Sequence, residues 1–162
     1  MEGDQKKGHV KPLPINSITE NVEVRPKVTC DNSEVQAVIS ALRKAVIDES
    51  YKPAIPTAEN PSLADEYIFD KEDEKSVLQN LKPENFVGKA IDLSKGAKKR
   101  KALGLPQEYL YVFKYPCELI KRESDKSGTS KENVLIYIKI NNRTTPYHIV
   151  FIVSFHKNNP KT

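Results

Sequence analysis

The chain has 162 residues and a formal net charge of +4 at pH 7, and 30% of its residues are charged. This size predicts one domain with a tail, and no apolar run approaches the length of a membrane span, so no membrane partner is expected. The N-terminus, MEGDQKKGHVKP, lacks the apolar core of a signal peptide, and Cys30 and Cys117 have no metal-like spacing. We therefore expect a cytoplasmic protein with two free thiols.

Residues 1–30 show no hydrophobic period and contain Pro12, Pro14 and Pro26, which prevent a long helix. This pattern predicts a flexible N-terminal arm with a short strand near residues 22–28. The arm is either a docking segment for a partner or a solvated tail. Residues 31–162 are expected to form a single domain.

Two helices are predicted in the first half of that domain. Residues 31–33 offer N-cap candidates for an amphipathic helix that runs to about residue 50. After a proline-rich linker, Asp70 and Asp73 are spaced like a capping box, and the acidic residues 72–74 suit a first helical turn better than a metal site. We therefore expect no bound metal. The residues expected to be buried are Val35, Val38, Ile39, Leu42, Val46 and Ile47 on the first helix and Val77, Leu78 and Leu81 on the second.

A basic segment follows the acidic one. Pro83 is placed to open a short helix, with Phe86 and Ile91 as apolar anchors. A loop or short helix then concentrates positive charge at Lys95, Lys98, Lys99, Arg100 and Lys101. Such a cluster either binds a phosphate backbone or is a solvated surface, and RNA binding would also draw on Lys139 and Arg143 further along the chain.

The C-terminal third contains three runs with a period of two, at residues 108–123, 132–140 and 147–157. They predict an antiparallel meander, with Val134, Ile136, Ile138 and Ile140 on one face of the middle strand. We expect an α+β fold in which N-terminal helices pack on a C-terminal antiparallel sheet of three or four strands. Strict alternation in the last run places Tyr147, Ile149, Phe151, Val153 and Phe155 on one face and His148, Val150, Ile152, Ser154 and His156 on the other.

The most specific chemistry lies on the outward face of the last hairpin. The sequence contains no G-x-S-x-G elbow, phosphate-binding loop or H-E-x-x-H motif, and Cys117 sits in a strand like an ordinary buried thiol. The hairpin face instead carries Tyr137, Lys139, His148 and His156. RNA is cleaved without a metal or cofactor when its 2′-hydroxyl attacks the adjacent phosphate, which needs groups that accept and donate protons and a fixed positive charge.

The partner of Tyr137 is left open by the sequence. A tight turn at residues 141–146 would pair Tyr137 with Val150 and leave His156 roughly 20 Å away at ~3.3 Å per residue, so that His148 would be the nearer histidine. A longer loop or a β-bulge would shift the pairing towards His156.

Several segments resemble one known family. IYIKI (136–140) and IVFIVSFHK (149–157) are similar to the closing hairpin of MqsR-type mRNA interferase toxins, of the RelE-like and barnase-like (BECR) ribonuclease superfamily. LKPENFVGKA (81–90) resembles the family's Phe-Tyr-Lys motif, although one residue longer and without the tyrosine. The resemblance implies a RelE-like fold, a catalytic Tyr137 and His156, with Lys157 as the alternative to His156, and a contribution from Lys89. It also implies a neutralising antitoxin or immunity protein.

Three functions follow from these patterns. The first is a metal-independent, toxin-like endoribonuclease that cleaves single-stranded RNA by 2′-hydroxyl transphosphorylation. The second is a non-catalytic RNA-binding module that uses the same basic cluster. The third is a protein-interaction domain that uses the N-terminal arm or an exposed sheet edge.

Overall fold

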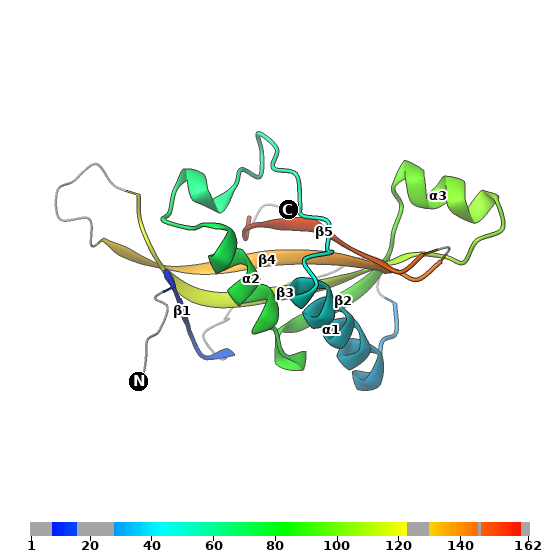
Figure 1. Cartoon of the computed structure of the whole chain (residues 1–162), viewed down its shortest axis with the longest axis horizontal. Helices are drawn as coiled ribbons and strands as arrows, with labels where there is room; N and C mark the ends of the chain where they lie inside the picture. Colours follow the sequence, from blue (N-terminus) through cyan, green and yellow to red (C-terminus); the bar gives the residue numbers. More distant parts are fainter. Residues whose placement is uncertain (1–7, 16–27, 123–129, 146, 160–162) are drawn as a thin grey trace.

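The computed structural model describes residues 8–15, 28–122, 130–145 and 147–159. The fold is α+β: helices α1 and α2 lie across a five-stranded antiparallel sheet whose long strands come from the C-terminal third (Figure 1). This arrangement confirms the predicted fold class. None of the described helices is both long and apolar enough to cross a membrane. The elements are β1 Val10–Pro12, α1 Asn32–Ile47, η2 Leu63–Asp65, α2 Lys71–Gln79, η3 Pro83–Asn85, β2 Phe86–Ile91, α3 Lys95–Ala102, β3 Tyr109–Ile120, β4 Lys131–Arg143 and β5 Ile149–Lys157.

The three C-terminal strands form the predicted meander in the order β3-β4-β5. Two further strands share the free edge of β3: β2 pairs with its first half and β1 with its second half, opposite residues 117–119. The sequence analysis expected no strand at residues 86–91 and assigned residues 10–12 to the arm, so part of that arm belongs to the sheet. The short strand expected near residues 22–28 lies outside the described residues, except for Val28.

The helices begin where side-chain caps were predicted. The Asp31 carboxylate accepts a hydrogen bond from the Glu34 amide (2.9 Å) at the start of α1, and Asp70 and Asp73 form a reciprocal capping box at the start of α2. The predicted stripe of α1 is buried except for Ile47, which is 71% exposed because α1 ends there. All three residues predicted as the buried side of α2 and its C-terminal extension are fully buried.

One hydrophobic core lies between α1, α2 and one face of the sheet. The strand residues on this face alternate strictly in β3 and β4, with Phe113 and Ile138 both 0% exposed. The sheet contributes Tyr111, Phe113, Tyr115, Cys117, Leu119, Val134, Ile136, Ile138, Ile140, Val150 and Ile152. The opposite face carries Lys114, Tyr137, Lys139, Asn141 and Arg143 together with apolar residues such as Val112 and Leu135.

A β-bulge in β5 breaks the strict alternation that the sequence suggested. Lys139 pairs with Ser154, but the next residue, Ile140, pairs with Ile152, so Val153 is an extra residue and is 44% exposed. Before the bulge, even-numbered residues of β5 face the core; after it, Phe155 does, and its ring packs 5.9 Å from that of Phe69. The assignment of all even positions in this strand to one face was therefore wrong.

Candidate functional site

Tyr137 of β4 and His156 of β5 are direct cross-strand neighbours on the face of the sheet opposite the core. Their rings stack with centroids 5.3 Å apart and an interplanar angle of 29°. The last paired residues of the β4–β5 hairpin are Arg143 and Ile149, so its loop lies further along the chain than the tight turn considered from the sequence. The bulge then places His156 on the face opposite the core. Of the two pairings that the sequence left open, the structure therefore has Tyr137 with His156.

Two lysines flank the Tyr137 ring. Lys114, its neighbour on β3, has its ammonium 5.9 Å from the ring centroid, and the Lys139 ammonium lies 5.7 Å away. Lys114 is only 2% exposed, and sequence reasoning missed it. The signal was present: in YVFKYPC it is the one charged residue of an apolar strand, at a position that alternation places opposite the core. The four side chains define the Tyr137 cluster: Lys114, Tyr137, Lys139 and His156.

The surroundings of this cluster select the neutral tautomer of His156 and shift the pKa values of Tyr137 and Lys139. The Nδ1 atom of His156 lies 2.9 Å from the Lys157 carbonyl oxygen, which can only accept, so Nδ1 carries the hydrogen and Nε2 holds a lone pair in the neutral ring. Burial raises the pKa of Tyr137, which keeps its hydroxyl protonated at neutral pH. Burial lowers the pKa of Lys139, partly opposed by the nearby Asp92 carboxylate.

A polar network continues the row along β4 from the Tyr137 cluster towards α3. Asn141 donates to Asp92 (2.7 Å) and to Glu108 (3.0 Å). Glu108 also receives two hydrogen bonds from Arg100 of α3, at 2.5 and 3.0 Å, and one from Arg143 at 3.3 Å. The pKa of Glu108 is lowered to about 2, mainly by the hydrogen bonds from Arg100. Burial opposes this effect, and Asn141 and Arg143 lower the pKa further. This network fixes α3 to the same end of the sheet as the β4–β5 connection (Figure 1).

The other predicted RNA-binding lysines lie on α3. Ser94 caps this helix, Ala97 is its one buried residue, and the Lys101 ammonium bonds to Gln107. Lys95, Lys98 and Lys99 are exposed. None of these three has an ion-pair partner within the part of the chain that the structure describes.

Two predicted site residues lie away from the Tyr137 cluster. Lys89 pairs with Tyr111 across β2 and β3, on the core face, where its ammonium forms an ion pair with Glu34 of α1. His148 is exposed, directly before the first residue of β5, and its Nε2 donates to the Asn142 side chain at 2.6 Å. Asn142 is five residues along β4 from Tyr137, roughly 16 Å at ~3.3 Å per residue, and on the opposite face. The structure therefore does not bring Lys89 or His148 to Tyr137.

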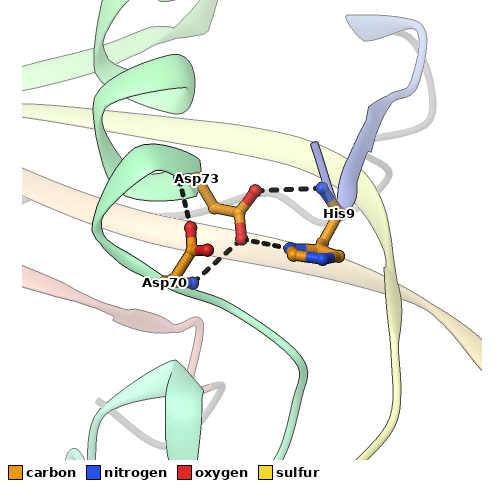
Figure 2. Close-up of side chains that lie close together, drawn as sticks. All are labelled: His9, Asp70 and Asp73. Carbon is orange, nitrogen blue, oxygen red and sulfur yellow. Dashed lines mark hydrogen bonds and ion pairs between the residues drawn. The ribbon is translucent and has the colours of Figure 1, made fainter. Parts of the chain in front are cut away.

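A third cluster joins His9, Asp70 and Asp73, with one possible metal-ligand atom from each within 4.8 Å of the others (Figure 2). Sequence reasoning missed it because His9 is 64 residues from Asp73. The Asp73 carboxylate already accepts from the His9 amide (2.9 Å), His9 Nδ1 (2.8 Å) and the Asp70 amide (2.9 Å). The hydrogen bonds of the Asp73 carboxylate thus link His9, the residue before β1, to the start of α2, and they hold this part of the N-terminal arm against the domain.

His156 also borders a hollow of about 250 Å³ at the C-terminal end of β5. Its charged lining groups are Glu59, Asp65, Glu66 and Lys157, and the Lys157 ammonium is 3.3 Å from Glu66 and 3.5 Å from Glu132. Along the strands, the Tyr137 cluster therefore lies between the charge-balanced Glu108 network, with the basic helix α3 beyond it, and a mainly acidic hollow at the end of β5.

No protein-family model matches the chain, and the comparisons with curated proteins and with solved structures found no match. The chemical capacity of the site therefore rests on its own geometry. A histidine whose Nε2 has no hydrogen-bond partner among the described residues, a protonated tyrosine and two lysines within one patch of sheet are suited to proton transfer beside a phosphate.

Proposed function

We propose that this protein is a metal-independent endoribonuclease that cleaves single-stranded RNA by transphosphorylation at the Tyr137 cluster. The observation that carries the proposal is the stacked Tyr137–His156 pair, with the Lys114 and Lys139 ammonium groups 5.9 and 5.7 Å from the centroid of the tyrosine ring. Transfer of the phosphoryl group from the 5′-oxygen to the neighbouring 2′-hydroxyl needs one base, one acid and positive charge, and these four side chains offer a candidate for each.

The proposed reaction assigns a separate role to each side chain. Nε2 of His156 accepts the proton of the ribose 2′-hydroxyl as that oxygen forms a bond to phosphorus. The Tyr137 hydroxyl donates its proton to the 5′-oxygen as the phosphorus–oxygen bond to it breaks. The Lys139 ammonium, helped by the Lys114 ammonium 5.9 Å from the ring centroid, stabilises the negative charge that accumulates on the phosphoryl oxygens. The products are a 2′,3′-cyclic phosphate and a 5′-hydroxyl.

The test is incubation of the full chain with an end-labelled single-stranded RNA in EDTA. We expect cleavage that leaves a cyclic phosphate, and no cleavage at a position that carries a 2′-deoxyribose. His156→Ala and Tyr137→Phe should each slow cleavage by about 10²–10⁴-fold, the usual contribution of one acid–base group. His148→Ala is the matched control, because this exposed histidine lies on the other face, and its rate should equal that of the wild type.

Thermal unfolding of each variant separates loss of the fold from loss of chemistry. A folded His156→Ala variant that cleaves as fast as the wild type would refute the proposed site. RNA binding without cleavage by the wild type would instead support a non-catalytic RNA-binding module, which the exposed residues Lys95, Lys98 and Lys99 of α3 favour.

A further inference from the structure

We propose that the RNA is held on one side of the cleaved phosphate only, along the path from Tyr137 through Arg143 and Phe151 to α3. This inference rests on the proposed function, because it takes the Tyr137 cluster as the place of cleavage. It defines the substrate class as a single strand with a required flank on one side of the cut and a dispensable flank on the other.

The first support is the direction of the polar row. Tyr137, Lys139, Asn141 and Arg143 are alternate residues of β4 and therefore share one face of the sheet. The row covers roughly 20 Å at ~3.3 Å per residue, which is enough for several nucleotides of an extended strand. It ends where Glu108 holds both Arg143 and Arg100 of α3.

The second support is an aromatic platform on that path. Phe151 pairs with Asn141, so its half-buried ring lies on the same face as Tyr137. The Arg143 guanidinium covers this ring with its central carbon 4.3 Å from the ring centroid, and Glu108 fixes the guanidinium from the side. Bases of single-stranded RNA stack on arginine planes and aromatic rings. The Arg143–Phe151 stack is therefore a platform on which a base of the flanking RNA can stack.

The third support is the difference in charge between the two sides. Beyond the Arg143–Phe151 stack, α3 presents Lys95, Lys98 and Lys99, which have no ion-pair partner among the residues described. On the other side of His156, the hollow at the end of β5 is lined by three carboxylates and one lysine, and that lysine is already paired with two glutamates. Phosphates are therefore attracted more strongly to the first side than to the second.

The experiment uses strands with a single ribose in a 2′-deoxy background, which fixes the cut. One strand has long flanks on both sides, one keeps only the 5′ flank, and one keeps only the 3′ flank. We expect one of the one-sided strands to be cleaved within threefold of the full strand and the other at least tenfold more slowly. Cleavage of both one-sided strands at equal rates would overturn the inference.

Variants then locate the required flank. Two variants are used: Phe151→Ala, and the triple change Lys95→Gln, Lys98→Gln and Lys99→Gln. Each should lower the cleavage rate of the strand that keeps this flank at least tenfold and leave the cleavage rate of the other one-sided strand unchanged. Lys44→Gln is the matched surface control, because Lys44 is exposed on α1, and it should have no effect. Equal slowing of both strands would also overturn the inference.

A binding measurement separates this inference from the proposed function. Fluorescence anisotropy with a non-cleavable, fully 2′-O-methylated strand requires no chemistry. Loss of three phosphate contacts should make the slope of log K against log[salt] shallower by about 2, at ~0.7 per contact for a single strand. If the wild type cleaves no RNA but the triple variant shows this change in slope, the binding path is supported and the catalytic proposal is refuted. An unchanged slope refutes the binding path.

Discussion

Replacement of Glu108 by glutamine should destabilise the protein at neutral pH and remove a specific part of its pH dependence. Glu108 is 8% exposed and accepts hydrogen bonds from Arg100, Asn141 and Arg143. These contacts lower its pKa from 4.5 to about 2. Since one pKa unit corresponds to about 1.36 kcal/mol, a lowering of this size corresponds to roughly 2–3 kcal/mol of stability.

The sign of the pH dependence follows from the lowered pKa. A carboxyl group whose pKa is lower in the folded state stabilises the fold fully above its unfolded value of 4.5. This stabilisation is lost as the pH falls from 4.5 towards 2. The difference between wild type and Glu108→Gln should therefore be largest at pH 7, about 2–3 kcal/mol, and should shrink steadily below pH 4.5.

Urea unfolding followed by circular dichroism at pH 7, 4 and 3 measures this difference directly. Glu49→Gln is the control, because Glu49 is 71% exposed and pairs with Lys75 at the surface, and it should change the stability by less than about 1 kcal/mol. A Glu108→Gln penalty that stays constant from pH 7 to pH 3 would show that the network does not hold a charged carboxylate. A penalty no larger than that of Glu49→Gln would show that it does not stabilise the attachment of α3.

Three further outcomes are expected. Leu42→Ala should cost about 2–5 kcal/mol in urea unfolding, because Leu42 is 0% exposed, whereas Ile47→Ala on the same helix should cost less than about 0.5 kcal/mol. Asp73→Ala should cost about 2 kcal/mol or more and should increase amide exchange in β1, since the Asp73 carboxylate holds both the α2 cap and the arm. Burial raises the pKa of Cys117 to about 12, so a thiol reagent should label Cys30 in the native protein and Cys117 only on unfolding.

The elements that sequence reasoning predicted are those with strong local signals. The capping residues of α1 and α2 and the alternating strands β3 and β4 follow from rules that act within a few residues. The strand β2 was missed because its sequence, FVGKAI, is short and contains a glycine, and its pairing with β3 is decided by a partner 27 residues away, as in Phe86 with Phe113. The same holds for β1, which only its partners on β3 and α2 identify as a strand.

The candidate site was predictable in its residue types but not in its geometry. Tyr137 and His156 stood out as proton-transfer groups on neighbouring strands, yet their pairing depends on hairpin length and on the bulge. Lys114 was not considered because it lies in the strand treated as core. The buried Glu108 network was also missed, because it joins helix α3, strand β4 and two connecting segments that are separated in sequence.

The bulge at Val153 resolves a conflict that the sequence of β5 contains. Val150 and Ile152 are both 3% exposed in the core, and strict alternation would turn His156 to that same face, where it could not meet Tyr137. One extra residue between the two halves reverses the facing of everything after it, so Phe155 joins the core and His156 pairs with Tyr137. The first half of the strand can therefore meet the packing requirements of the core while the second half presents a polar ring, and the extra residue itself, at 44% exposure, lies where it displaces no core side chain.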